Sequence, residues 1–587
     1  MSKRAEKKST FTTFDGVKLV YRSWEPTQAS SGEKKALIVI HRGHEHSGRL
    51  IDLIDGVNQP DCWAFGYDSR GHGESPGPRG YAPTFAHIIK DLDTFVNFIC
   101  KEYGIKMENV FVIANSVGAV VCSSWVHDYA PKIRGMVLAA PAFQVKLYVP
   151  LALPGCRLLD AIKHPAFISS YVKSKFLTHD PEQQKKYDED KLITPEIAVN
   201  ILVGLYDAAE RVVNDAGAIH TPTQIFSAGS DWVVSNVPQK KFFENLSSGK
   251  KEFITLDGFY HGVLYEKDRK IPFDHIHRFI NECFAKPVES VDLVVADKKG
   301  WTYEEYTRIQ SGEISPINKL SYVFQVMSMK TLGKLSEGIR IGYKYGFDSG
   351  ISLDHVYKNK AKGDLVLGKI IDYFYINAVG WKGIRARRVH MRESLNHCID
   401  ALLAEGKPVR IMDIGSGPGR YLLETAKKYE NKDVKVLLRD YSEANVNEGK
   451  AIAQELGVKN SEHMQADAFD PSTYQVQAFR PNILIVSGLF ELFPSNETVL
   501  KAVQGATSIL EDGGYIVYTG QPWHPQLEMI AHTLPNREGQ NWVMRRRTQA
   551  EIDQLFARHG ADKFDMKIDQ WGIFTVASAK YNKNKAA

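Results

Sequence analysis

Residues 110–118 have the sequence Val-Phe-Val-Ile-Ala-Asn-Ser-Val-Gly, in which an apolar strand runs into a turn and then into a helical segment. A serine in such a turn, here Ser116, is typical of a nucleophile elbow, which needs small residues two positions before and after it. Ala114 and Gly118 are those small residues. The bare pattern is common, so its position between a strand and a helix is what predicts a catalytic serine.

Short apolar segments alternate with amphipathic helical segments on either side of this stretch, and the alternation predicts a mostly parallel sheet. Between residues 144 and 216 the chain is mainly helical and shows no strand pattern. We therefore expect one α/β domain over residues 10–284 that carries a helical insertion. Its expected strands are 36–40, 62–67, 110–114, 136–140, 223–227 and 252–256.

Two further residues complete a candidate catalytic triad in the chain order serine, acid, histidine. Asp231 follows the expected strand 223–227, and His261 follows the strand 252–256. A carboxylate at a strand end can orient an imidazole, and His261 would take the Ser116 proton and return it to the leaving group. One histidine among 19 means little, but three correct residue types at three strand ends favour a serine hydrolase.

Two more motifs accompany the triad, one at residues 41–49 (His-Arg-Gly-His-Glu-His-Ser-Gly-Arg) and one at 68–75 (Asp-Ser-Arg-Gly-His-Gly-Glu-Ser). Together with the triad they resemble the monoacylglycerol lipase and lysophospholipase branch of the α/β-hydrolases over residues 10–284. The resemblance implies an acyl-ester or lipid substrate and a cap domain at about 144–216. It also implies an oxyanion hole made by the backbone N–H groups of Gly43 and Val117.

The sequence departs from that family at two positions. Arg42 replaces a glycine beside the oxyanion residue, and Asn115 replaces a histidine that is common before the nucleophile. We consider two roles for Arg42: it distorts the oxyanion loop, or it reaches into the site toward an anionic headgroup. Distortion would leave the N-terminal half a non-catalytic binding module.

A second α/β pattern occupies the C-terminal half, where residues 409–419 (Val-Arg-Ile-Met-Asp-Ile-Gly-Ser-Gly-Pro-Gly) carry a strand into a glycine-rich turn. Such a turn lets the backbone approach a nucleoside-bearing ligand. The last two expected strands are close enough to form an antiparallel hairpin. The expected strands are 409–414, 434–439, 462–466, 482–487, 514–519, 565–569 and 573–577.

Three features favour S-adenosyl-L-methionine over a dinucleotide as the ligand of this turn. The glycines follow the spacing Gly-x-Gly-x-Gly after the acidic residue Asp413, not the dinucleotide spacing. Asp440 ends the second strand, where a carboxylate can bind ribose, and Asp467 follows the third, where it can bind the adenine amine. The closing hairpin is the third feature. A dinucleotide-dependent oxidoreductase remains the competing interpretation.

Residues 385–587 therefore resemble a class I S-adenosylmethionine-dependent methyltransferase, a Rossmann-like domain with a seven-stranded sheet. Methyl transfer needs mainly alignment of donor and acceptor, so the acceptor is hard to infer from sequence. Glu491, His524 and the run 545–547 are candidates for acceptor contacts, although ordinary surface positions are the favoured alternative. The resemblance implies that the methyl donor is held by Asp413, Gly415, Gly417, Gly419, Asp440, Asp467 and Ser487.

We expect residues 285–384 to form a helical linker region that is rich in basic residues. One of its helices should begin at Ser315-Pro316, where a capping serine precedes a proline. Two interpretations remain open: the helices pack on the methyltransferase with a solvated basic face, or they form a peripheral surface that docks on anionic lipid headgroups. The basic residues are Lys319, Lys330, Lys334 and Arg340, and a second cluster extends past the linker with Lys382, Arg385, Arg387, Arg388 and Arg392.

The bulk properties of the 587-residue chain fit a two-enzyme fusion. A net charge of +5 is too small to argue for nucleic acid, and no apolar run is long enough to span a bilayer. Six scattered cysteines and a polar N-terminus without a signal-like segment predict a cytoplasmic protein with reduced thiols and no metal site.

We therefore expect a serine hydrolase of acyl esters fused to a methyltransferase that acts on a lipid or small molecule. The alternative is a carboxyl methyltransferase joined to its own methylesterase.

Overall fold

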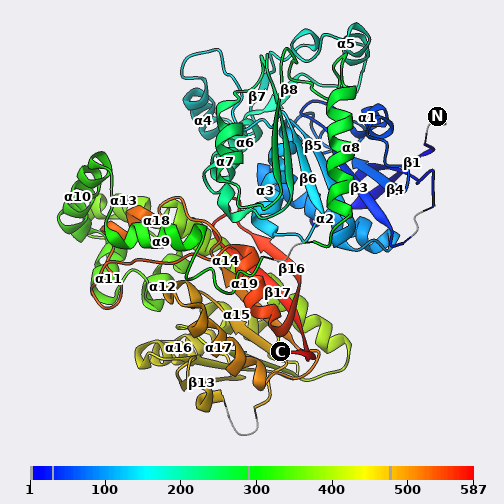
Figure 1. The fold of residues 1–587 in the computed structure, drawn as a ribbon. Coiled ribbons are helices and arrows are strands. Elements are labelled where there is room, and N and C mark those ends of the chain that lie inside the picture. Colours follow the sequence, from blue (N-terminus) through cyan, green and yellow to red (C-terminus); the bar gives the residue numbers. More distant parts are fainter. Residues whose placement is uncertain (1–3, 30–31, 289–290, 475–478, 587) are drawn as a thin grey trace. The chain divides into compact units, whose positions relative to one another are not determined.

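The computed structural model describes residues 4–29, 32–288, 291–474 and 479–586 (Figure 1). The chain forms two compact units, Met1–Val291 and Asp292–Ala587, and each has its own large sheet. The helices expected between the two domains belong to the second unit from residue 292 onward. Within the described ranges, none of the helices combines the length and hydropathy that crossing a bilayer requires.

The first unit contains an eight-stranded sheet with the order β1-β2-β4-β3-β5-β6-β9-β10. Strands β4, β3, β5, β6, β9 and β10 run parallel to one another. Strand β1 pairs with β2, and β2 with β4, in antiparallel fashion. The six parallel strands lie where the apolar pattern predicted them. The expected strands included neither β1 nor β2. The edge strand β1 is mostly polar and exposed, so it lacks the apolar pattern, whereas β2 is mostly buried. The strands are β1 (Glu6–Thr12), β2 (Lys18–Trp24), β3 (Lys35–Ile40), β4 (Cys62–Tyr67), β5 (Val110–Asn115), β6 (Gly135–Ala139), β9 (Thr223–Ala228) and β10 (Lys251–Leu256).

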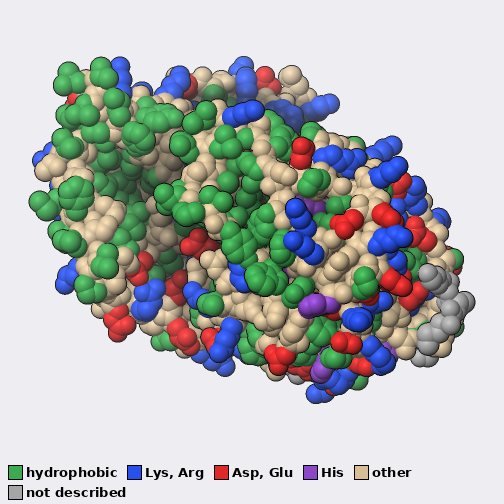
Figure 2. Space-filling model, turned by 90° about the horizontal axis from the view of Figure 1, so that it is seen from above, with side chains coloured by type: hydrophobic (Ala, Val, Ile, Leu, Met, Phe, Trp, Pro, Cys, Tyr) green, Lys and Arg blue, Asp and Glu red, His purple; other side chains and the backbone are tan. Residues whose placement is uncertain are grey.

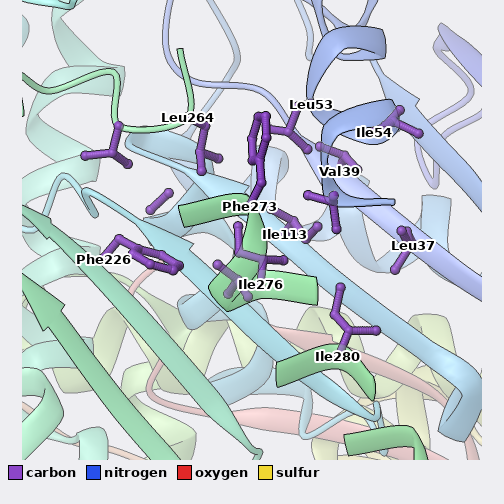
Figure 3. Packing of buried hydrophobic residues seen from close by; sticks show 14 of the residues in the cluster. Leu37, Val39, Leu53, Ile54, Ile113, Phe226, Leu264, Phe273, Ile276 and Ile280 are labelled. Atoms are coloured by element: carbon purple, nitrogen blue, oxygen red, sulfur yellow. The ribbon is translucent and has the colours of Figure 1, made fainter. Parts of the chain in front are cut away.

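Helices cover both faces of this sheet, which explains why its parallel strands are near-continuous apolar runs. Figure 3 shows Phe273, Ile276 and Ile280 of α8 pointing toward strand residues such as Val39 and Ile113. Helix α3, which follows the nucleophile, is buried from its second residue onward. The covering helices are α1 (Ile51–Val57), α2 (Phe85–Tyr103), α3 (Val117–Tyr129), α7 (Val237–Asn245) and α8 (Lys270–Phe284).

The insertion expected at 144–216 is mostly helical, but the expectation that it contains no strand was wrong. Residues 167–169 and 196–198 pair as a short antiparallel sheet of two strands. Three-residue strands leave no alternation to detect, so tertiary contact decides them. The elements of this cap are α4 (Ala152–Ile162), β7 (Phe167–Ser169), α5 (Pro181–Asp188), β8 (Glu196–Ala198) and α6 (Val199–Asn214).

The second unit contains a seven-stranded sheet with the order β13-β12-β11-β14-β15-β17-β16. The first five are parallel, and β17 runs antiparallel to both its neighbours, as the closing hairpin predicted. This is a Rossmann-like arrangement with a hairpin at one edge. The strands are β11 (Val409–Asp413), β12 (Val434–Asp440), β13 (Ser461–Gln465), β14 (Ile483–Val486), β15 (Tyr515–Gly520), β16 (His559–Ile568) and β17 (Thr575–Ala586).

Two groups of helices surround this sheet. The long helix α14 packs Leu395, Ile399 and Leu402 into the main core with Ile411 of β11. A second apolar cluster joins the helices before residue 385 to the hairpin through Phe347, Trp381 and Phe574. The helices are α9 (Trp301–Ser311), α10 (Pro316–Lys330), α11 (Glu337–Tyr345), α12 (Gly350–Lys358), α13 (Leu365–Ile376), α14 (Val379–Ala404), α15 (Arg420–Lys428), α16 (Glu443–Leu456), α17 (Asn496–Ser508), α18 (Leu527–Thr533) and α19 (Gln549–Ala557).

Candidate active sites

Ser116 lies in the sharp turn between β5 and α3. Its backbone has φ 55° and ψ −114°, a strained conformation that is typical of a nucleophile elbow. Gly118 is the residue that lets the turn close, because a Cβ there would lie 2.6 Å from the carbonyl oxygen of His41. The strand, the turn and the buried helix behind it thus hold the serine at the carboxyl edge of the sheet.

The three predicted catalytic residues form one hydrogen-bonded chain. His261 Nε2 lies 2.7 Å from Ser116 Oγ, and His261 Nδ1 lies 2.9 Å from Asp231 Oδ2. The other oxygen of Asp231 accepts the backbone N–H groups of Val233 at 2.7 Å and Val234 at 2.9 Å. Burial by itself raises the pKa of Asp231, but His261 and these N–H groups hold it below its ordinary value. The carboxylate therefore stays ionised opposite the imidazole.

The predicted oxyanion residues lie side by side. A Cβ on Gly43 would lie 3.1 Å from Val117 Cγ2. Val117 is the first residue of α3, so its N–H has no intrahelical acceptor and is available to a ligand. The loop is held from behind by His41, whose Nε2 accepts the Ser69 N–H at 3.2 Å while Nδ1 donates to the Arg42 carbonyl at 2.7 Å.

The Arg42 side chain is buried in the protein, and Arg42 also lines the cavity at Ser116. Its Nη2 donates to Glu45 Oε1 at 2.8 Å, and its guanidinium lies 4.8 Å from the ring centre of Tyr265. Arg49 donates to the same Glu45 oxygen at 3.0 Å. Burial raises the pKa of Glu45, but the two guanidinium groups hold it below its ordinary value. The large side chain is thus accommodated beside the oxyanion loop.

A cavity of about 160 Å³ opens at Ser116 and His261. Its walls are mainly apolar, with Val121 from α3, Ile168 from the cap strand β7 and Leu202 from the cap helix α6. The cap and the sheet layer therefore enclose a space suited to an acyl chain next to the nucleophile.

The glycine-rich turn of the second unit lies between β11 and α15. Gly419 has φ 68°, and a Cβ there would lie 2.1 Å from Leu438 Cδ2, so no larger residue fits. The Gly417 N–H donates to Asp440 Oδ2 at 2.8 Å, which links the turn to the end of β12. Asp440 Oδ1 accepts the Ser442 N–H at 2.9 Å. These contacts fix the Asp440 carboxylate at the rim of a pocket of about 90 Å³.

Asp413 is completely buried beneath the turn. Its Oδ1 accepts the Gly415 N–H at 3.2 Å, and Oδ2 accepts the hydroxyl of Tyr421. Burial raises the pKa of Asp413 to about 7, although the Tyr421 hydrogen bond opposes the rise. Its contacts with Gly415 and Tyr421 show a role in shaping the turn.

The structure brings most of the predicted cofactor residues together. Gly415, Gly417, Gly419, Asp440 and Ser487 line one pocket, and Asp413 supports it from beneath. Asp467 is not among the residues that line this pocket. Its Oδ1 instead accepts the backbone N–H of Phe469 at 2.8 Å.

Sequence reasoning missed a second wall of this pocket, which comes from the helices before residue 385. Asp348, Gly350 and Tyr357 line it from the start of α12 and along that helix, and Arg387 lines it from α14. A Cβ on Gly350 would lie 2.7 Å from the Pro418 ring. The sequence feature that could have indicated this wall is the helix start at Ser349, whose side chain accepts the Ser352 N–H at 3.2 Å.

The acceptor candidates are not surface residues. Glu491 and His524 are buried and line a second cavity. The arginines at 545–547 are also buried, but none of them lines that cavity. Arg547 Nη1, for example, donates to the carbonyl of Phe490 at 2.6 Å. The interpretation of these positions as ordinary surface residues was therefore wrong, and Arg547 holds the loop that contains Glu491.

The first fold and its triad define an α/β-hydrolase unit, and the second fold with its glycine turn defines a Rossmann-like unit. Residues 31–268 match the family model described as "Serine aminopeptidase, S33", and residues 276–581 match the one described as "Putative methyltransferase". The chain belongs to this methyltransferase family and carries a lipase-like hydrolase unit before the methyltransferase unit.

The chain is similar to one relative over nearly its whole length and to others over its first half. The chain is 45% identical over 578 residues to YnbC of Escherichia coli strain K12, covering 98% of both chains. Monoglyceride lipase of Rattus norvegicus is 26% identical over 268 residues, which is 45% of this chain and 86% of the relative. The solved structure of Paleococcus ferrophilus monoacylglycerol lipase matches 48% of this chain and 99% of its own, with 23% identity and a TM-score of 0.40.

Proposed function

We propose that the protein is a bifunctional enzyme, a serine hydrolase of acyl esters joined to an S-adenosyl-L-methionine-dependent methyltransferase that acts on a lipid or small molecule. The observation that carries the hydrolase activity is the chain of hydrogen bonds Ser116–His261–Asp231, which opens into an apolar cavity. His261 accepts the proton of Ser116 as the hydroxyl attacks the ester carbonyl, and then donates it to the leaving alcohol. The N–H groups of Gly43 and Val117 stabilise the oxyanion.

The chemistry of the second pocket supports S-adenosyl-L-methionine as the methyl donor. This molecule carries an ammonium and a carboxylate at one end and an adenosine group, with its ribose hydroxyls, at the other. Asp348 Oδ1 and Arg387 Nε are buried without a hydrogen-bond partner among the described residues, and both residues line the pocket. They suit the ammonium and the carboxylate, whereas Asp440 suits the ribose hydroxyls. When bound, the donor supplies an electrophilic methyl group, and the protein holds and orients it.

The experiment that tests the first activity uses the full chain, a series of monoacylglycerols and a fluorophosphonate probe. We expect hydrolysis that improves with acyl-chain length, and probe labelling that Ser116→Ala abolishes. A folded wild-type protein that neither hydrolyses the series nor reacts with the probe would make the first unit a binding module instead.

The experiment that tests the second activity combines calorimetry with S-adenosyl-L-methionine and transfer of an isotopic methyl label into a cell extract. We expect binding that Gly419→Ala abolishes, and a labelled product that Ser116→Ala does not increase. Binding of a nicotinamide dinucleotide instead would refute the methyl-donor assignment. A labelled product that accumulates with Ser116→Ala and otherwise decays to methanol would replace the proposal with a carboxyl methyltransferase and its methylesterase.

A further inference from the structure

A second cavity of about 190 Å³ lies next to the glycine-turn pocket within the second unit. The two spaces share five residues in their walls, Asp348, Leu353, Arg387, Gly488 and Leu492. Gly488 and Leu492 follow the carboxyl end of β14, where Rossmann-like sheets bind their ligands. A molecule in this cavity would therefore meet a ligand of the glycine turn across that wall.

The walls of this cavity are predominantly apolar and aromatic. Many of them come from α14, from α18 with the loop after it, and from the turn of the closing hairpin, while α10, α12 and α13 add further residues. Such walls favour an apolar ligand, because removing apolar surface from contact with water is favourable. Six of the lining residues are Trp381, Ile384, Met529, Trp542, Met544 and Phe574.

Among the polar side chains that interrupt the apolar lining are Glu491, Gln521 and His524. Both carboxylate oxygens of Glu491 and the Nε2 of Gln521 are buried and have no hydrogen-bond partner among the described residues. Glu491 is 8% exposed and Gln521 is 3% exposed. His524 Nδ1 accepts the Gln526 N–H at 3.0 Å, which leaves its proton on Nε2 as a donor. Buried polar atoms rarely lack a partner in a folded protein, so this arrangement indicates a ligand that supplies the missing partners.

The environment of Glu491 matches a role in proton transfer. Burial raises its pKa above the ordinary value, and the positive charge of Arg387 limits the rise. A desolvated carboxylate is a stronger base than an exposed one.

We propose that this cavity binds the methyl acceptor, an apolar or amphiphilic molecule whose reacting oxygen or nitrogen bears a proton, and that Glu491 accepts this proton. The inference rests on the methyltransferase activity proposed above. The acceptor atom forms a bond to the methyl carbon and loses its proton to the Glu491 carboxylate. The carbon–sulfur bond breaks and its electron pair stays on sulfur, after which Glu491 returns the proton to water.

The binding half of the proposal is tested with a fatty alcohol that carries a diazirine, cross-linked to the full chain by light and located by mass spectrometry. We expect cross-links to residues such as Met529 and Met544. The cavity-filling variant Ile384→Trp should reduce these at least five-fold without changing cross-links in the hydrolase cavity. Cross-links confined to the hydrolase cavity would overturn the proposal.

The proton-transfer half is tested by label transfer from S-adenosyl-L-methionine to a total lipid extract. We expect Glu491→Gln to lower the transfer rate by about 10²–10⁴-fold, while calorimetry shows unchanged affinity for the methyl donor. Glu491→Asp should restore part of the rate. Glu528→Gln is the matched control, because its carboxylate is paired with Arg308 at 2.8 Å outside the cavity lining.

The possible results separate this inference from the proposed function. If the wild-type protein does not bind S-adenosyl-L-methionine, the methyltransferase assignment itself is refuted. Donor binding with an unchanged transfer rate in Glu491→Gln would refute only the role of Glu491. Donor binding with no labelled lipid and no cross-link in the cavity would refute the apolar acceptor.

A different observation carries a second proposal, which concerns the outer face of helices α10 and α13. Helix α10 buries none of its residues, and its apolar side chains, among them Leu320 and Phe324, are 74% and 72% exposed. Leu365, Val366 and Phe374 of α13 are similarly exposed. Figure 2 shows hydrophobic side chains gathered at the left end of the view, where Figure 1 places both helices.

Basic residues accompany this apolar face. Both helices contact the short helix η5 (Leu332–Leu335), so they lie near each other. Residues 316–376 contain nine Lys and Arg against five Asp and Glu, and α10 itself contains two lysines and no acid. Exposed apolar side chains among lysines complement a bilayer that contains anionic lipids. Gln325 and Met329 of α10 also line the acceptor cavity, so the surface continues to its wall.

We infer that this face docks on the surface of an anionic bilayer. The test is co-sedimentation of the full chain with vesicles of phosphatidylcholine alone or mixed with phosphatidylglycerol. We expect binding to the mixed vesicles that high salt weakens, and at least ten-fold weaker binding for the double variant Leu320→Glu/Phe324→Glu. Val237→Glu, which alters an equally exposed residue of the first unit, is the control.

Two results would overturn this second proposal. The first is equal binding of the double variant and the wild-type protein. The second is the absence of vesicle binding together with a dimer that the double variant dissociates, since a second copy of the chain would then cover the face.

Discussion

The substitution Asp231→Asn tests whether the carboxylate acts on catalysis through His261. Asp231 uses one oxygen for the N–H groups of Val233 and Val234 and the other for His261 Nδ1. An asparagine has a single carbonyl oxygen. If that oxygen keeps the two backbone bonds, the amide NH₂ faces Nδ1. The imidazole must then carry its proton on Nε2, where it points at Ser116 and cannot accept a proton.

The expected loss follows from this wrong tautomer. In Ser-His-Asp sites the same change lowers kcat by about 10⁴-fold, which corresponds to about 5 kcal/mol of transition-state stabilisation. The free energy of unfolding should change much less, because the two backbone hydrogen bonds remain. Only the charge-assisted hydrogen bond between the Asp231 carboxylate and His261 Nδ1 is lost. Its cost is about 1–3 kcal/mol.

The assay compares steady-state hydrolysis of a p-nitrophenyl ester and the rate of fluorophosphonate labelling in the wild type, Asp231→Asn and Ser116→Ala. Asp257→Asn is the matched control, since Asp257 is an exposed carboxylate four residues before His261. We expect both rates to fall by about 10⁴-fold in Asp231→Asn, to be abolished in Ser116→Ala and to be unchanged in Asp257→Asn. A loss of less than ten-fold with intact folding would refute the view that Asp231 sets the tautomer of His261.

Three further predictions concern the glycine turn, a buried histidine and a buried ion pair. Gly419→Ala should abolish detectable binding of S-adenosyl-L-methionine in calorimetry and lower the free energy of unfolding by about 1–3 kcal/mol, because its Cβ would lie 2.1 Å from Leu438 Cδ2; wild-type affinity would contradict it. Burial lowers the pKa of His524 to about 4, so between pH 4 and the ordinary value near 6.5 the unfolded chain binds a proton that the folded chain does not. Stability should therefore fall by about 3 kcal/mol as the pH falls through this window, and urea unfolding of His524→Gln should show a weaker pH dependence than the wild type; identical slopes would exclude His524 as the source. Glu45→Gln should lower the free energy of unfolding by about 3–5 kcal/mol, since it leaves the buried Arg42 guanidinium without its charged partner; urea denaturation that shows a loss below about 1 kcal/mol would argue that water reaches Arg42.

The parallel strands and the residues at their ends were predictable for a common reason. Parallel strands are covered on both faces, so they are short apolar runs that stand out from the surrounding chain. A nucleophile, an acid and a histidine at successive strand ends converge at one edge of the sheet. The same reasoning located the glycine turn and Asp440. Polar or very short strands such as β1, β7 and β8 lack that signal.

The roles of single side chains with several possible partners were not predictable. The sequence suggested two roles for Arg42. The structure adds a further one, a buried ion pair with Glu45 beside the ring of Tyr265. Glu491 and the arginines at 545–547 had the composition of a surface segment. Their burial depends on helices that are distant in the chain, as the ion pair of Arg546 with Glu305 illustrates.

The sequence by itself determined the two sheets, the triad and the glycine turn, because local hydrophobic periodicity and fixed spacings specify strands and the turns that follow them. Only the tertiary structure decided which walls complete each site. The cap over Ser116, the α12 wall of the glycine-turn pocket and the cavity around Glu491 each join segments that are far apart in the chain. Such contacts depend on how whole helices pack against each other, and side-chain complementarity over that distance leaves no periodic pattern in the sequence.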